Sequence, residues 1–142
     1  MKMKANLIIY DKVKDEIEVF LSLRSKTATM FPNYFSFYGG KIEDGETAEG
    51  ALIRELREEL ELKLDSYSFL GEYKTPGAIK NVFYSRVSKN VVDKLIIHEG
   101  QDGKWFNIKM ITSEKKLIKE DKEILKTFFK RLIGKNNSSN LV

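Results

Sequence analysis

Three glutamates within one turn of a predicted helix form the most chemically suggestive pattern in the chain. Glu55, Glu58 and Glu59 have the spacing i, i+3 and i+4, which places their carboxylates on one helical face. Like charges at this spacing repel each other by about a few tenths of a kcal/mol per pair. Mg²⁺ or Mn²⁺ would reverse the sign of the effect, because hard cations prefer oxygen ligands. Arg54 can neutralise and orient one carboxylate. By itself the pattern is typical of an ordinary solvated acidic face, and the residues before the helix are needed to favour a divalent-cation site.

The residues before this helix fit the same chemistry. Gly39 and Gly40 lack a Cβ, so the backbone there can approach a metal ion or a phosphate closely. Glu46 follows, at the start of the predicted helix. Residues 39–62 contain eight acidic and three basic residues, although the whole chain has a formal charge of +4. An acidic segment within a basic chain is easier to explain if a bound cation offsets its negative charge.

Strands and helices that could position these residues follow from hydrophobic periodicity and turn signals. We expect Thr47 to cap the first helix, Pro76-Gly77 to form a hairpin turn, and Gly39-Gly40 and Gly134 to end the elements before them. The order indicates an α/β fold, a mixed sheet with helices packed against it. The expected strands are 4–10, 17–24, 34–38, 66–75, 78–87, 95–98 and 104–108, and the expected helices are 47–60 and 120–133.

Composition limits the class of protein. The chain has 142 residues, enough for one domain, which we place at residues 1–134, followed by a polar tail at 135–142 that we expect to be disordered. The absence of cysteine excludes disulfides, thiolate metal sites and a cysteine nucleophile. No apolar run approaches the roughly 18 residues of a membrane span. A cytoplasmic protein without a membrane partner is therefore expected.

The charge of the C-terminal part leaves two interpretations open. Residues 104–142 contain ten Lys and Arg but four Asp and Glu. Such a segment could attract nucleic acid, whereas solvated helix faces commonly carry the same charge. We expect the solvated face, and therefore no nucleic-acid partner.

Gly40, Glu46 and residues 54–62 together resemble the Nudix box, written G-x5-E-x7-R-E-U-x-E-E-x-G-U with U aliphatic. Every specified position matches except one, where Glu61 replaces glycine. A residue with a Cβ there must bear a positive φ or let the helix run on towards Leu64. Residues 20–24, 35–43 and 99–106 resemble the MutT-like branch, so the resemblance covers about residues 4–133. Tyr38 replaces the proline common before the double glycine.

The resemblance implies a Nudix α/β/α sandwich with a mixed sheet between helices, and a Mg²⁺-dependent pyrophosphohydrolase in which Mn²⁺ may substitute. The substrate would be a nucleoside diphosphate linked to a further group, such as a nucleoside triphosphate. The implied catalytic residues are Glu55, Glu58, Arg54 and Glu99, with either Glu55 or Glu99 as the base. Glu46 would brace the loop. The implied metal ligands are Gly39, through its carbonyl, and Glu55, Glu58, Glu59 and Glu99.

Substrate-binding candidates are less sharply defined. Arg24 could contact phosphate, Gly40 could lie close to the substrate, Tyr84 could stack on a base, and Asp121 is near the position of a base-reading residue in relatives. Exposed-edge, core and helix-terminus roles are the respective alternatives for Arg24, Tyr84 and Asp121. His98 is interpreted as a strand residue. A nucleotide-binding sensor without turnover remains the alternative function, and the assembly is expected to be a monomer or homodimer.

Overall fold

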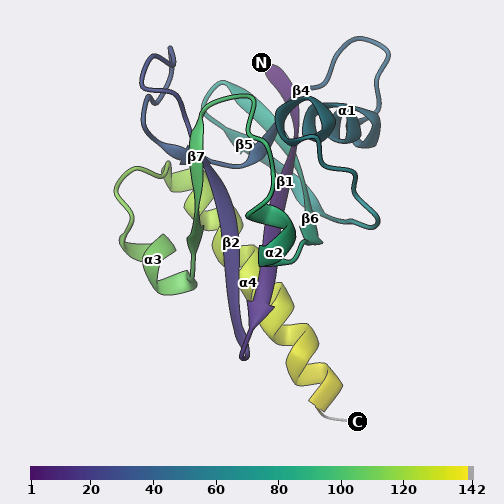
Figure 1. Ribbon diagram of the computed structural model, residues 1–142, viewed down its shortest axis with the longest axis vertical. Helices are drawn as coiled ribbons and strands as arrows, with labels where there is room; N and C mark the ends of the chain where they lie inside the picture. Colours follow the sequence, from purple (N-terminus) through teal and green to yellow (C-terminus); the bar gives the residue numbers. More distant parts are fainter. Residues whose placement is uncertain (141–142) are drawn as a thin grey trace.

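A mixed β-sheet crosses the middle of the molecule (Figure 1). The computed structural model describes residues 1–140, with side chains described as far as residue 134. Within these residues the strands are β1 (Lys2–Val13), β2 (Glu16–Leu23), β3 (Phe35–Ser36), β4 (Tyr38–Lys41), β5 (Ser68–Thr75), β6 (Ala78–Arg86) and β7 (Gln101–Phe106). The helices are α1 (Ala48–Leu60), α2 (Lys89–Val92), α3 (Ile108–Ser113) and α4 (Lys119–Asn140).

Strand β1 is the organising strand of this sheet. The main order is β3-β2-β1-β6-β5, with β4 also paired to β1 and β7 also paired to β2. Strand β6 runs parallel to β1, whereas β2 and β4 pair with it in antiparallel fashion. The first half of β1, residues 4–7, pairs with β4, and residues 9–13 pair with β2. Strands β4 and β2 therefore pair with consecutive parts of β1, and they separate between residues 7 and 9.

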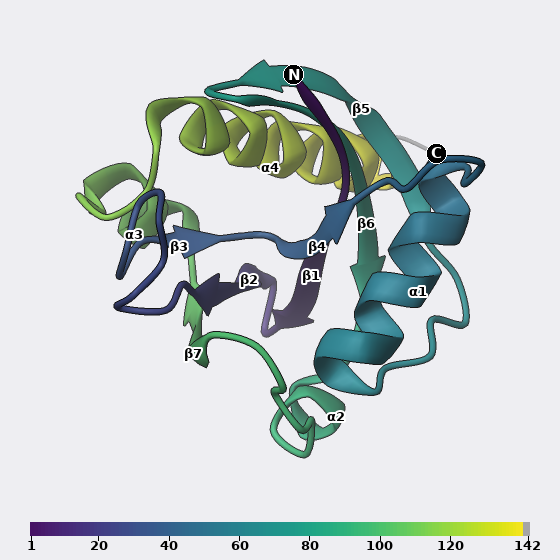
Figure 2. The same ribbon diagram turned by 90° about the horizontal axis from the view of Figure 1, so that it is seen from above.

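Alternating side chains of β1 supply two hydrophobic cores, one on each face of the sheet. Leu7 and Ile9 belong to the cluster that contains the buried face of α1, and Ile8 belongs to the cluster that contains α4. Figure 2 shows α1 and α4 on opposite sides of the sheet. The prediction of an α/β/α sandwich with a mixed sheet is therefore confirmed.

Helix α1 has the predicted boundaries and an unusual end. The Thr47 side chain accepts a hydrogen bond from the Gly50 N–H at 3.0 Å, which confirms it as the N-cap. Leu52, Leu56 and Leu60 are fully buried. The helix ends at Leu60, because Glu61 adopts the left-handed conformation with φ 51° and ψ 31°. Of the two alternatives for the missing glycine, the structure therefore has the positive φ and not the longer helix.

Several predicted boundaries were wrong. Gly39 and Gly40 do not end a strand but lie within β4, and residues 95–98 form no strand. Helices α2 and α3 were not predicted, and α4 continues past Gly134 to Asn140. Residues 135–140 of the tail that we expected to be disordered lie in α4, and the last two residues, 141–142, are outside the described part of the chain. No helix of the described chain is long and apolar enough to cross a membrane.

Candidate functional site

Arg54 connects the loop before α1 with the carboxylates on the helix. Its Nε and Nη2 donate to the two carboxylate oxygens of Glu46 at 2.8 and 2.9 Å. Its Nη1 donates to Glu55 at 3.0 Å and to Glu58 at 3.3 Å. Glu46 also accepts from the Glu43 backbone N–H at 2.9 Å. These contacts lower the pKa of Glu46 to about 2, because Arg54 and the backbone stabilise the carboxylate form. Arg54 thus fixes three acidic side chains relative to one another.

Glu59, unlike the glutamates that Arg54 contacts, is buried. It is 6% exposed and accepts a hydrogen bond from the Gly39 N–H at 3.0 Å. Burial raises the pKa of Glu59 to about 8, and the negative charges of Glu55 and Glu99 add to that effect. Glu55 also favours the protonated form by hydrogen bonding to it. A carboxyl group in this position carries a proton at neutral pH unless a positive charge replaces that proton.

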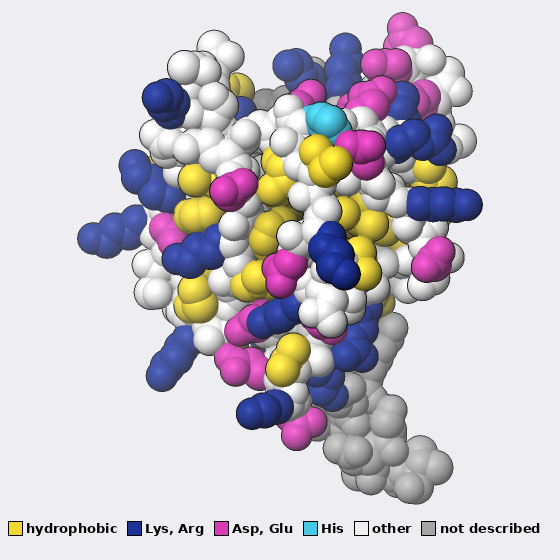
Figure 3. Space-filling model, in the orientation of Figure 1, with side chains coloured by type: hydrophobic (Ala, Val, Ile, Leu, Met, Phe, Trp, Pro, Cys, Tyr) yellow, Lys and Arg dark blue, Asp and Glu magenta, His cyan; other side chains and the backbone are white. Residues whose placement is uncertain are grey.

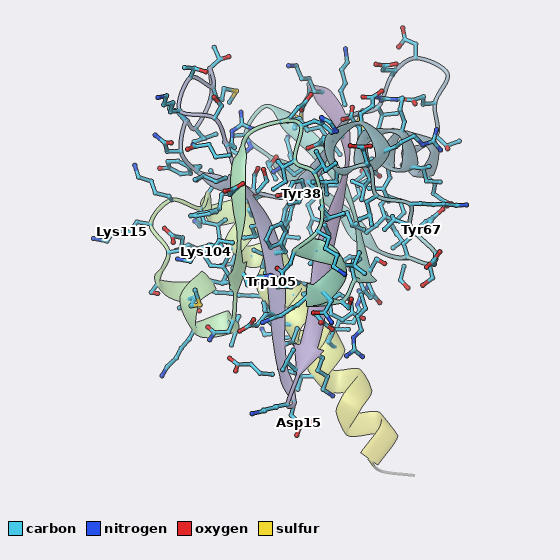
Figure 4. The ribbon with its side chains drawn as sticks, viewed as in Figure 1. Asp15, Tyr38, Tyr67, Lys104, Trp105 and Lys115 are labelled. Atoms are coloured by element: carbon cyan, nitrogen blue, oxygen red, sulfur yellow. The ribbon has the colours of Figure 1, made fainter. Side chains whose placement is uncertain are left out.

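The double glycine of β4 permits the close contact between this strand and α1. A Cβ at Gly40 would lie 2.6 Å from the carboxyl carbon of Glu55. Gly39 has φ +128°, and a Cβ there would lie 2.1 Å from the carbonyl oxygen of Ala5. The next residue back, Tyr38, points into the molecule (Figure 4) and is fully buried. Its ring stacks on that of Phe20 at 5.8 Å between ring centroids. A side chain at Gly40 would therefore push β4 away from Glu55, and one at Gly39 would push it away from β1.

Glu99 reaches the same region from the loop before β7. It lines a cavity together with Glu59, Gly39 and Arg24, and its charge contributes to the raised pKa of both Glu55 and Glu59. The structure thus brings the predicted ligands Glu55, Glu59, Glu99 and Gly39 to one place. The Glu58 side chain, joined to them through Arg54, is 58% exposed.

These residues fit a hard divalent cation by their chemistry. The side chains are carboxylates, and burial followed by negative neighbours raises the pKa of Glu55 as well as that of Glu59. A cation would stabilise the ionised carboxylates against both their burial and their mutual repulsion. Among the described residues, no group of three or more Asp, Glu, His or Cys side chains already has the geometry of a metal site. Instead, Arg54 donates hydrogen bonds to Glu55 and Glu58, and the Gly39 N–H donates one to Glu59.

A second cavity adjoins the first. Arg24 and Ser36 line both, and the second cavity is also lined by Asp121 and Lys80. Lys80 Nζ contacts the two carboxylate oxygens of Asp121 at 2.8 and 3.1 Å. Burial raises the pKa of Asp121, although Lys80 opposes that shift. Lys80 was not predicted as a site residue, because a lysine within a strand pattern gives no sign of a buried ion pair.

Tyr84 lies away from both cavities. Its side chain is 6% exposed and packs in the core on the α4 side, with its ring 5.5 Å from that of Phe128. Strand alternation is the reason, since the neighbouring Phe83 points to the α1 side of the sheet. The prediction that Tyr84 contacts substrate was therefore wrong, and the core alternative holds.

Comparison with known proteins identifies the family. The model of the NUDIX domain matches residues 2–128. The 8-oxo-dGTP diphosphatase of Escherichia coli is 34% identical over 93 residues, which cover 64% of this chain and 70% of the relative. The Bacillus subtilis protein YtkD is 37% identical over 59 residues, which cover 39% of this chain. That match spans only 37% of the length of YtkD.

Solved structures agree on the fold. A MutT/nudix family protein from Listeria innocua superposes with a TM-score of 0.77 at 21% identity. The superposition covers 94% of this chain and 95% of the other. The strand order, the helix with its glutamates against the double glycine, and the match over residues 2–128 lead to one conclusion. The chain belongs to the Nudix family, in its MutT-like branch.

Proposed function

We propose that this chain is a hydrolase of phosphoric anhydride bonds, cleaving the diphosphate of a nucleoside diphosphate linked to a further group. One observation carries the proposal. Glu59 and Glu99 line a cavity beside Gly39, and Glu55 lies close enough for its charge to act on Glu59, while burial, aided by the negative neighbours, raises the pKa of both Glu55 and Glu59. Carboxyl groups that are held close together and partly buried, so that their ionised forms are disfavoured, are typical of sites that bind a cation and an anionic substrate.

Mg²⁺, or Mn²⁺ in its place, would be held by Glu55, Glu58, Glu59 and Glu99 with the Gly39 carbonyl. Such an ion supplies charge neutralisation at the diphosphate and lowers the pKa of an attacking water. Glu59 must lose its proton to act as a ligand, and the Gly39 N–H stabilises the resulting carboxylate. Gly40 leaves room for the Glu55 carboxyl group beside the strand.

The proton of the attacking water would pass to a carboxylate of this cluster. Glu55 and Glu99 are the two candidates, because the charges of both act on Glu59 and the charge of Glu99 also acts on Glu55, which places them at the same cluster. Arg54 holds Glu55 and Glu58 in position, and Glu46 fixes Arg54 to the loop. The base is therefore one of these two glutamates.

The nucleoside would occupy the adjoining cavity. Arg24 lies at the junction of the two cavities, where it could contact a phosphate, and Asp121 and Lys80 lie beyond it. A nucleobase carries both hydrogen-bond donors and acceptors, and this ion pair offers both in return. The Escherichia coli relative named 8-oxo-dGTP diphosphatase supports a nucleotide as substrate. A soluble cytoplasmic enzyme would fit such a substrate.

The experiment is a nucleotide panel with the purified chain, followed as release of pyrophosphate or phosphate with and without Mg²⁺. We expect Mg²⁺-dependent release from at least one nucleoside triphosphate, oxidised nucleotide, dinucleoside polyphosphate or nucleotide sugar. Saturable nucleotide binding without release from any member would instead support the sensor function. Tight and steeply salt-dependent binding to nucleic acid would support neither.

A further inference from the structure

The left-handed residue after α1 has an unusual identity. The Glu61 N–H donates to the Arg57 carbonyl and the Leu62 N–H donates to the Leu56 carbonyl, which is the hydrogen-bond pattern of a helix end normally closed by glycine. Any residue with a Cβ pays conformational free energy at φ 51°. A glutamate at this position is therefore explained by its side chain and not by the turn.

The Glu61 side chain contacts the only histidine of the chain. His98 Nε2 lies 2.7 Å from Glu61 Oε2, and because an ionised carboxylate can only accept, the imidazole donates. The His98 backbone N–H donates to the Glu59 carbonyl at 2.8 Å. The side chains of His98 and Glu61 are 48% and 56% exposed. Figure 3 shows the histidine in cyan at the surface, beside acidic side chains. Exposed pairs of this kind add little to stability.

Glu99 follows His98 directly and is held from its other side as well. Gly100 has φ +77° and passes so close to β2 that a Cβ would lie 2.9 Å from the Leu23 carbonyl oxygen. Gln101 Nε2 then donates to the Arg24 carbonyl at 2.8 Å and to Asn33 at 2.9 Å. The cavity residue Glu99 is thus fixed between an anchor on α1 and an anchor on β2.

We propose that Glu61 and His98 are positioning residues, a clasp that fastens the loop bearing Glu99 to the end of the helix bearing Glu59. The clasp gives a function to the glutamate in a glycine-favouring position, because it places Glu99 at the carboxylate cluster. The inference rests on the proposed function, since Glu99 acts there as a ligand or base. His98 and Glu61 themselves touch neither substrate nor reacting atoms.

The variant Glu61→Gly distinguishes a positioning role from a purely structural one. It should keep or raise the thermal stability but lower the Mn²⁺ affinity and kcat/KM, whereas loss of a structural residue would lower the stability as well. Glycine relieves the left-handed strain, so the Tm should stay within about 3 °C of the wild-type value or rise. Loss of the clasp should weaken Mn²⁺ binding, measured by electron paramagnetic resonance, and lower kcat/KM by about tenfold. His98→Ala should do the same, and Glu61→Gln, which keeps an acceptor oxygen, should restore most of the affinity. Lys126→Ala, which breaks the exposed pair with Glu123, is the matched control.

A double-mutant cycle with Glu99→Gln tests whether the clasp acts through Glu99. In that background, Glu61→Gly should produce no further loss of Mn²⁺ affinity or kcat/KM. Wild-type affinity and turnover in Glu61→Gly, or losses that simply add to those of Glu99→Gln, would overturn the clasp. Failure of the proposed function would look different, because the wild-type protein itself would then lack nucleotide turnover while its Mn²⁺ affinity still reports on the clasp.

Discussion

At the scale of single residues, the glutamates of α1 differ sharply in environment although they lie within one helical turn. The positive charge of Arg54 offsets the negative charges of Glu55 and Glu58. Glu59, by contrast, is buried and accepts a hydrogen bond from the Gly39 backbone N–H. Removal of Glu59 from water therefore outweighs that hydrogen bond, and its pKa rises to about 8. Without a bound cation this carboxyl group keeps its proton at neutral pH, whereas the proposed role of Glu59 as a metal ligand requires the ionised form.

A pH dependence of stability follows from this raised pKa. The folded chain keeps the Glu59 proton in a pH range where the unfolded chain has released it, so the contribution is complete below about pH 4.5 and is lost as the pH rises through about 8. In EDTA, the free energy of unfolding measured by urea denaturation should fall from pH 5 to pH 8.5. Glu59→Gln should flatten this slope. An unchanged slope in that variant would contradict the assignment, and Glu49→Gln, at an exposed position on the same helix, is the control.

Turnover should depend on the same carboxylates. Glu58→Gln and Glu59→Gln preserve side-chain shape but remove a charged oxygen ligand, so each should lower kcat by more than about a hundredfold. Circular dichroism should show both variants folded. Glu49→Gln removes an equal charge from α1 away from the cluster and should keep wild-type kcat. Comparable activity in either purified cluster variant would remove the assigned role.

At the scale of elements, long periodic segments were predicted well and short ones were not. Leu52, Leu56 and Leu60 predicted the buried stripe of α1, and Pro76-Gly77 predicted the hairpin between β5 and β6. Helices α2 and α3 have four and six residues and begin at the side-chain caps Ser88 and Asn107. Segments this short are not stable helices by themselves, so their formation depends on packing that periodicity does not express.

The double glycine shows the same limit in a strand. Glycine usually weakens a strand, yet Gly39 and Gly40 pair with Asn6 and Ala5 of β1. The reason is a close approach that involves residues far away in the sequence, the carbonyl of Ala5 and the carboxyl of Glu55. The trio Glu55, Glu58 and Glu59 could be predicted from local spacing, whereas Glu99 came only from the family resemblance. The partnership of Lys80 with Asp121 could not, because it joins residues 41 positions apart.

The start of α1 gives an element-scale prediction. Thr47 is exposed, so Thr47→Ala removes essentially the hydrogen bond to the Gly50 N–H and should lower the free energy of unfolding by about 1 kcal/mol. Thr47→Ser keeps the hydroxyl and should stay close to wild type. Urea denaturation of the three proteins is the measurement. An equal loss in both variants would mean that the methyl group, and not the cap, carries the effect.

At the scale of the whole molecule, a buried ion pair joins the layer of α4 to the sheet. The side chains of Lys80 and Asp121 are 10% and 2% exposed, and they cross from β6 to the start of α4. Lys80 also lies 5.3 Å from the centre of the Phe37 ring. The pair lines one cavity, Glu59 and Glu99 line the other, and Arg24 and Ser36 border both.

Removal of one partner of this pair should be costly. Lys80→Met leaves Asp121 buried without its cation and should destabilise the protein by about 3–5 kcal/mol. The double variant Lys80→Met with Asp121→Leu should recover much of that loss, since no uncompensated charge remains. Thermal denaturation monitored by circular dichroism measures both. A single variant as stable as wild type would contradict the pairing.

The path of β1 has a practical consequence for experiments with this protein. Lys4, two residues into the strand, lines the cavity of Lys80 and Asp121, while α4 leaves the body of the molecule at the other pole (Figure 1). A purification tag fused ahead of Met1 would emerge beside this cavity, the proposed nucleoside site, and would obstruct it. Kinetic assays and ligand soaks are better served by a tag attached beyond the final helix.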